Sequence, residues 1–212
     1  MRKRWVVFLL AAVSVFSLSA CGASEEDEAA MSAMSEKLET RVSFEKRSGS
    51  GFLAETELYD TPVYLEQQDD GSYRDNLIAV QYEDETVAFL EDCARTYFET
   101  ANVYYTVSNA VVSDMLSEDA SFEAFLADSG LQLQAMIEIK ESEFTSQESV
   151  VQMAGSLAMY GTQMDLAVVI VPDDVFGQQS QSDLEKLVRN DEFAAYAHVV
   201  CAGGAVDIQW AE

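Results

Sequence analysis

The spacing of hydrophobic and polar residues predicts several strands in the second half of the chain. Residues 131–140 are apolar at every second position, which predicts a strand with one face in solvent. Residues 165–172 are apolar without alternation, so we expect a strand that is buried on both faces at the centre of a sheet. Residues 198–210 predict two strands joined by a turn at Gly203-Gly204.

Helical periodicity is clearest in residues 84–101, where apolar side chains recur three and four positions apart and acidic ones occupy the other face. Thr145 and Ser182 each precede a Glu by three positions, the spacing of a capping box, and predict two further helices. Strands and helices therefore alternate from residue 77 onward. This order predicts an α/β fold, with a mixed sheet flanked by helices.

Residues 42–82 have a different pattern, with short strand-like runs at 52–59, 63–66 and 77–82 separated by turn residues. They predict an antiparallel N-terminal portion built from β-hairpins. An α+β fold of two small pieces is the alternative.

The start of the chain has the three parts of a secretory signal. Arg2-Lys3-Arg4 is followed by an apolar run over residues 5–16, too short to span a bilayer, and then by Leu18-Ser19-Ala20-Cys21. This last sequence resembles the lipobox of bacterial lipoproteins. The resemblance covers residues 1–21 and implies cleavage before Cys21, lipidation of Cys21 and anchoring in the cell membrane on its extracytoplasmic face. An uncleaved membrane helix, or an ordinary signal with an incidental cysteine, is the alternative.

Three segments follow from this interpretation: a signal peptide at 1–20, the lipidated cysteine with an acidic flexible tether at 21–39, and a single globular extracytoplasmic domain at 40–212. The tether is predicted because small and acidic residues dominate it. A short helix over residues 29–38, which are rich in Ala and Glu, is the alternative for this segment.

Charge excludes some partners and leaves others open. The formal net charge is −26, and it falls to −29 once the three basic residues of the signal are removed. Such a chain is not expected to bind nucleic acid or an anionic membrane surface, since both attract Lys and Arg. Two cysteines remain after Cys21: Cys93 and Cys201 form one disulfide or stay as two buried thiols.

Few residues point to catalysis. The single histidine, His198, lies on an apolar strand, where a hydrogen-bonded structural role competes with a role in a catalytic triad. Zinc would need a set of Cys and His ligands that the sequence lacks. Asp173 and Asp174 follow the predicted central strand and are the best candidates for a Ca²⁺ or Mg²⁺ site, with backbone capping in a turn as the competing role.

These observations predict a non-enzymatic binding or interaction module of the bacterial cell envelope that needs no cofactor. Its expected partners are the membrane, through the lipid on Cys21, and an envelope protein, a solute or a cell-wall component. The alternatives are a carboxylate- or divalent-metal-dependent envelope hydrolase and a structural or assembly factor that works as an oligomer.

Overall fold

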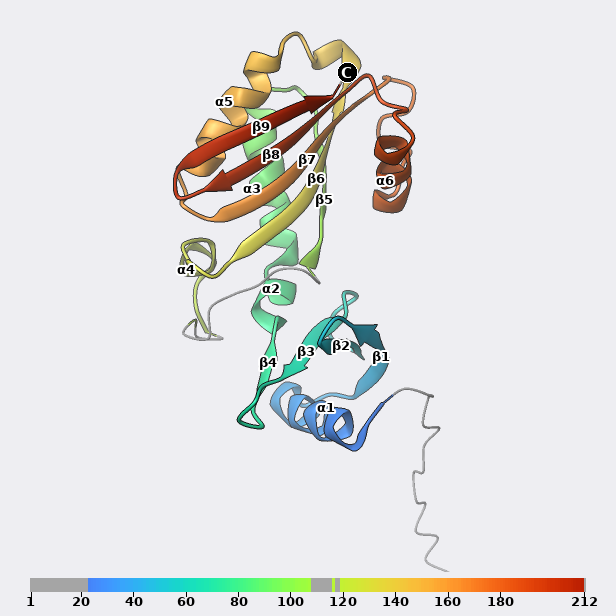
Figure 1. The fold of residues 1–212 in the computed structure, drawn as a ribbon, viewed down its shortest axis with the longest axis vertical. Helices are drawn as coiled ribbons and strands as arrows, with labels where there is room; N and C mark the ends of the chain where they lie inside the picture. Colours follow the sequence, from blue (N-terminus) through green and yellow to red (C-terminus); the bar gives the residue numbers. More distant parts are fainter. Residues whose placement is uncertain (1–22, 108–115, 117–118, 212) are drawn as a thin grey trace, which may run out of the picture.

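The strands of the protein form two separate sheets (Figure 1). The computed structural model describes residues 23–107, 116 and 119–211, so the predicted signal peptide and Cys21 lie outside it. A four-stranded antiparallel sheet, β1-β2-β3-β4, precedes a five-stranded mixed sheet, β5-β6-β7-β8-β9. The predicted α/β fold, a mixed sheet flanked by helices with an antiparallel N-terminal portion, is therefore confirmed.

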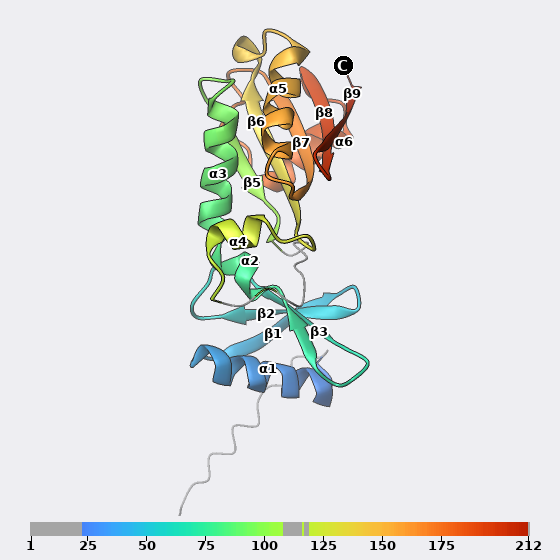
Figure 2. The ribbon, with the colours of Figure 1, turned by 90° about the vertical axis from the view of Figure 1, so that its left-hand side faces the viewer.

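The first sheet lies at one end of the molecule, beside a helix (Figure 2). The chain runs through α1 (Glu25–Leu38), β1 (Val42–Ser48), β2 (Gly51–Thr56), β3 (Val63–Gln67) and β4 (Tyr73–Asp75). All three neighbouring strand pairs are antiparallel. This is the meander that the sequence predicts, with its fourth strand at Tyr73–Asp75.

Helix α1 occupies most of the segment predicted as a tether. Ser24 and Asp27 form a capping box at its start, and the Asp27 carboxylate is also paired with Arg47 on β1. Ala30 and Met34, four residues apart, are buried against the core. The prediction of a flexible tether is therefore wrong from Glu25 onward, because two apolar residues and one ion pair fix the helix to the first sheet.

The second sheet is built around one parallel strand pair. The strands are β5 (Asn102–Tyr105), β6 (Gln132–Lys140), β7 (Gln163–Val171), β8 (Ala195–Ala202) and β9 (Ala205–Ala211). Strands β6 and β7 are parallel, and the other pairs are antiparallel. Strand β7 is the middle strand, as predicted, and the β8–β9 turn has positive φ at both Gly203 and Gly204.

Helices cover the two faces of this sheet unequally. The remaining helices of the described residues are α2 (Leu77–Gln81), α3 (Glu83–Arg95), α4 (Phe122–Leu126), the short 3₁₀ helix η2 (Glu141–Glu143), α5 (Gln147–Ala158) and α6 (Gln181–Arg189). On one face α3 contacts β5 and α5 contacts β8 and β9. On the other face α6 covers a smaller apolar cluster around Val169, Val171 and Leu184. None of the helices in the described ranges has the length and apolar character needed to cross a bilayer.

The sequence predicts a strand at residues 77–82, but the structure has the helix α2 there. Leu77, Ile78, Ala79 and Val80 are all buried, so this short apolar run is surrounded by core and shows neither the period of a strand nor that of a surface helix. The helix caps are also displaced from their predicted positions. Ser146, not Thr145, occupies the N-cap position of α5, without a side-chain capping hydrogen bond. Ser180, not Ser182, caps α6 through a capping box with Asp183.

Glu138 fixes the loop that follows β7 to the sheet. Its side chain on β6 is fully buried. The carboxylate accepts hydrogen bonds from Asn102 Nδ2 at 2.8 Å, from the Tyr104 hydroxyl at 3.3 Å and from the Gly177 backbone N–H at 3.2 Å. Burial, and then the charge of Glu138, raise the pKa of Tyr104 to about 12. This network therefore fixes the loop after β7 against the sheet.

Asn76 connects the two sheets. Its side chain is 3% exposed. The amide oxygen accepts a hydrogen bond from the Tyr64 backbone N–H on β3 at 2.7 Å, and the amide nitrogen donates to the Val107 carbonyl at 3.1 Å. One continuous buried cluster includes residues of both sheets. The Asn76 amide therefore satisfies one backbone group of β3 and one in the segment that follows β5.

Replacing Asn76 tests this connection. We expect Asn76→Ala to lower the free energy of unfolding by about 2–3 kcal/mol, because it leaves a buried N–H and a buried C=O without partners. Urea unfolding followed by circular dichroism measures the change. The matched control is Asn190→Ala at an exposed position, which should shift it by less than about 0.5 kcal/mol. Equal effects of the two substitutions would contradict the role given to Asn76.

Candidate functional site: a groove between α3 and α5

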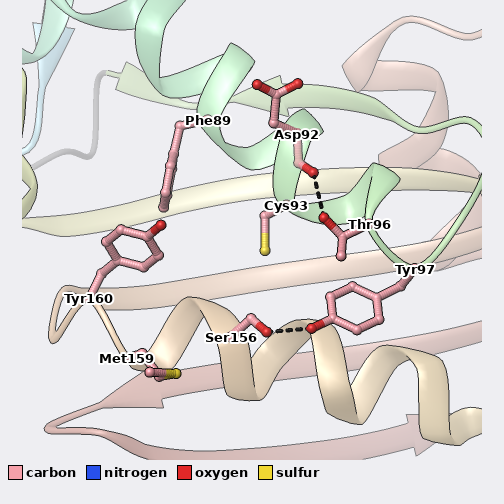
Figure 3. A pocket seen from close by; sticks show the side chains of 8 residues that line it. All are labelled: Phe89, Asp92, Cys93, Thr96, Tyr97, Ser156, Met159 and Tyr160. Atoms are coloured by element: carbon pink, nitrogen blue, oxygen red, sulfur yellow. Dashed lines mark hydrogen bonds between the residues drawn. The ribbon is translucent and has the colours of Figure 1, made fainter.

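A cavity with a mostly apolar lining lies between α3 and α5 (Figure 3). Its volume is about 660 Å³, within the range of small-molecule and peptide side-chain pockets. Eight residues from the two helices and the turns that follow them line it: Phe89, Asp92, Cys93, Thr96, Tyr97, Ser156, Met159 and Tyr160. We call this cavity the α3–α5 groove.

The groove forms because the two helices cover different parts of one sheet face. Leu90 and Ala94 of α3 and Leu157 of α5 point into the core. The residues directly before them in the sequence, Phe89, Cys93 and Ser156, lie above the core and line the groove. Ser156 has a small side chain on α5, so it leaves space that a larger residue would fill.

Aromatic rings form the walls of the groove. Phe89 and Tyr160 meet edge to face, with ring centroids 4.8 Å apart, and the Tyr97 hydroxyl is hydrogen-bonded to Ser156 Oγ at the other end. Figure 3 shows the Cys93 thiol between these two pairs. Each pair joins one residue of the α3 segment to one of the α5 segment, so the walls are fixed by contacts made across the groove.

Two large apolar side chains at the edge of the groove are exposed to solvent. Met159 is 87% exposed and Tyr160 is 54% exposed, although both are placed directly after a well-packed helix. Asp92 supplies a carboxylate at the rim, pointing away from the other lining side chains in Figure 3. An apolar hollow with a flexible Met and a negative rim suits an apolar group that carries a positive charge beside it.

The cysteine in the groove is a weakly acidic thiol. Burial, and then the neighbouring Cys201, raise the pKa of Cys93 above its ordinary value of 9.0. The Cys93 thiol lies 4.0 Å from the Met153 carbonyl oxygen, and the Cys201 thiol lies 3.7 Å from that of Ala154. A thiol held in its neutral form is a poor nucleophile, so Cys93 does not suit covalent catalysis.

Cys93 and Cys201 are free thiols in the structure. Of the two possibilities drawn from the sequence, the structure has the unpaired thiols and not the disulfide. Burial also raises the pKa of Cys201. Both side chains lie against the same turn of α5, where they act as small apolar packing groups.

Asp173 and Asp174 do not converge on a metal site. Asp173 Oδ1 accepts a hydrogen bond from the Ser142 backbone N–H at 3.0 Å. Hydrogen bonding from the Ser142 side chain, and then from its backbone N–H, lowers the pKa of Asp173, and the nearby positive charge of Lys140 adds to this effect. Within residues 23–107, 116 and 119–211, no three Cys, His, Asp or Glu side chains are grouped to hold a metal ion. The arrangement fits backbone capping, the competing role for these residues.

His198 lies on β8, away from the α3–α5 groove. Its Nε2 is 2.7 Å from Asp165 Oδ1, so the hydrogen-bonded role is the one the structure has. In the described part of the chain, no hydroxyl or thiol is hydrogen-bonded to His198. The pair therefore lacks the nucleophile that a triad requires.

The sequence reasoning missed the groove because it has no local motif. Phe89 and Tyr160 are 71 positions apart, and only the fold brings them together. One local signal was present: Met159 and Tyr160 continue the apolar content of α5 past the residue where its buried stripe ends. Large apolar residues outside a buried stripe are informative when they are grouped.

Comparisons with known proteins give little guidance. No family model matches the sequence, and no curated protein matches it significantly. Among solved structures, the protein is similar to a DUF5037 family protein from Ruminococcus gnavus ATCC 29149, with a TM-score of 0.45 and 10% sequence identity. The alignment covers 84% of this chain and 92% of that protein.

The environment of the thiols predicts their reactivity. We expect iodoacetamide to modify Cys93 more slowly than a free cysteine at neutral pH, since its raised pKa lowers the thiolate fraction. The rate should keep increasing with pH beyond 9.0, its ordinary value. Cys201, which is buried, should react only after unfolding. Peptide mass spectrometry measures both sites.

The control is the same chain unfolded in urea without reductant. Both cysteines should then react fully and at the same rate. A thiol that stays unmodified in urea and becomes reactive only after reduction would show a disulfide and contradict the assignment.

Proposed function

We propose that the chain is a membrane-anchored extracytoplasmic lipoprotein that acts as a non-enzymatic binding module of the bacterial cell envelope. The anchoring part of this proposal rests on Arg2-Lys3-Arg4, the apolar run after it and the lipobox-like Leu18-Ser19-Ala20-Cys21. A diacylglyceryl group on Cys21 would place at least two acyl chains on one residue, enough for stable attachment where one chain is marginal.

The binding part rests on one observation: the α3–α5 groove exposes Met159 and Tyr160 at its mouth. A partner that buried one of these side chains would stabilise the complex by about 1.5–3 kcal/mol. An aromatic hollow of this size accepts one or two side chains of an incoming segment. Met adapts its shape to different partners better than a branched side chain does.

The occupant we propose is a segment of an envelope protein with an apolar side chain next to a Lys or Arg. The apolar side chain would lie against Phe89 and Tyr160. The basic residue would face Asp92, on a chain whose formal net charge is −26. This charge favours cationic partners and speeds their association.

The site chemistry favours binding over hydrolysis in this groove. Asp92 is the one carboxylate that lines it, and the Cys93 thiol has a raised pKa. Carboxylate-based hydrolysis needs two acids that face each other across the substrate. A binding role requires only the shape and the apolar lining that the groove has.

Cys21→Ala tests the anchor. We expect the parent chain to be labelled by a radioactive fatty acid and to fractionate with membranes. The variant should lose the label and be either uncleaved or released, because no other residue would carry the acyl chains. Retention and processing of the variant like the parent would contradict the proposed localisation.

A photo-crosslinking residue at position 159 tests the groove. We expect benzoylphenylalanine in place of Met159 to give a discrete adduct in intact cells, since this position lies at the mouth of the groove. The matched control places the same residue at Val151, which is 42% exposed on α5 but does not line the groove. Immunoblotting detects the adducts, and position 151 should give none.

The variant Thr96→Trp tests whether the adduct at position 159 depends on an open groove. Thr96 is an exposed lining residue, so a Trp there fills the groove with little cost to the fold, which urea unfolding would verify. The adduct at position 159 should then disappear. Equal adducts from positions 159 and 151, or an adduct that Thr96→Trp leaves unchanged, would contradict the role of the groove.

A further inference from the structure

A second cavity lies on the opposite face of the five-stranded sheet, between the sheet and α6, and its volume is about 310 Å³. Gln134 of β6, Asp165 of β7, and Tyr196 and His198 of β8 line it from the sheet, and Gln181 lines it from α6. These residues come from four elements. None of them belongs to the α3–α5 groove.

The cavity exists because Ala167 has a small side chain at the centre of this face. Ala167 lies directly opposite Met136 on β6 and His198 on β8 in the strand register. Its methyl group is thus flanked by longer side chains on both sides. The loop held by Glu138 and the helix α6 cover the neighbouring part of the face around Val169 and Leu184, so the hollow has a wall as well as a floor.

The walls of this cavity carry both hydrogen-bond donors and hydrogen-bond acceptors. His198 Nε2 and Asp165 Oδ1 are 2.7 Å apart, and their side chains are 36% and 53% exposed. Gln181 Nε2 donates to Thr106 Oγ1 at 2.7 Å, which fixes the orientation of this amide at the edge of the cavity. Carboxylate, imidazole and amide groups placed close together can each donate to or accept from the hydroxyl groups of one ligand.

One aromatic side chain adds an apolar contact to this polar set. Tyr196 packs against Phe193, with ring centroids 5.7 Å apart, and lines the same cavity as His198, two residues further along β8. Burial, and then the nearby Asp165 carboxylate, raise the pKa of Tyr196, so its hydroxyl stays protonated. An aromatic ring beside fixed carboxylate and amide groups offers both an apolar surface for C–H groups and partners for O–H groups.

Charge limits the class of ligand. Asp165 and Glu185 both line the cavity, and the whole chain has a formal net charge of −26, so phosphates and other anions are disfavoured. A purely apolar ligand would displace water from these polar groups and offer them no hydrogen bonds in return. We propose that this cavity binds an uncharged saccharide, with its hydroxyl groups on Asp165, His198 and the glutamine amides and its ring against Tyr196.

The single histidine of the chain gives a direct assay. The full chain, carried in micelles of a sugar-free detergent and labelled with ¹³C at the histidine Cε1, has one imidazole signal in the NMR spectrum. We expect cellobiose, maltose or N,N′-diacetylchitobiose to shift this signal saturably, with a dissociation constant of about 1 mM or somewhat lower for a shallow site. Glucuronate, as an anionic sugar, should not shift it.

Two variants separate binding in the cavity from non-specific effects. Ala167→Leu fills the hollow and keeps every polar group, so it should weaken binding at least about tenfold. The matched control, Ala33→Leu on the exposed surface of α1, should bind like the parent. Asp165→Asn keeps the size of the side chain and should also weaken binding. It provides the test of the cavity if Ala167→Leu does not fold.

Two results would overturn the proposal. One is an imidazole signal that none of the three disaccharides shifts at concentrations well above millimolar. The other is a shift that persists unchanged in both Ala167→Leu and Asp165→Asn. Neither result bears on the α3–α5 groove, which lies on the other face of the sheet.

Discussion

Burial of one apolar face of the five-stranded sheet is the constraint on which the rest of the structure depends. Leu133, Ile137, Leu166, Val168 and Val199 are all fully buried on that face. No single helix is wide enough to cover it, so α3 covers the β5 side and α5 the β8–β9 side. The groove between them is a consequence of this division. The binding surface that we propose is thus built from the same packing that stabilises the fold.

The opposite face of the sheet has a different arrangement. The Glu138 network and α6 cover only the part around Val169, Val171 and Leu184. The remainder keeps polar side chains, and Ala167 leaves a hollow among them. The two faces therefore offer two chemically distinct cavities, one apolar and aromatic and one polar. If both proposals hold, the protein would contact a protein segment through one face of the sheet and a saccharide through the other.

Regular periodicity made much of the fold predictable from the sequence. The strand at β6, the amphipathic α3, the central position of β7 and the Gly203-Gly204 turn all follow from local patterns. Local patterns failed where distant contacts decide the structure. Residues 77–82 contain a short apolar run that is a helix because core surrounds it. Helix α1 depends on Arg47, 20 positions from its partner Asp27.

The sites were less predictable than the fold. The sequence left Cys93 and Cys201 as either one disulfide or two thiols, and only the structure shows that both are free. Neither cavity has a motif, since each is lined by residues from separate elements. His198 was noticed as the single histidine, but its pairing with Asp165 depends on the register of β7 and β8. The sequence therefore indicated which residues were unusual and not how they combine.

Hydroxyl-radical footprinting in isolated native membranes, compared with the purified chain, tests the central claim most directly. That claim is that a partner occupies the α3–α5 groove. Met159 and Tyr160 should be strongly oxidised in the purified chain and protected in membranes. Leu58, which is 55% exposed on the other part of the molecule, should be labelled equally in both. Equal oxidation of Met159 and Tyr160 in the two samples would contradict the account.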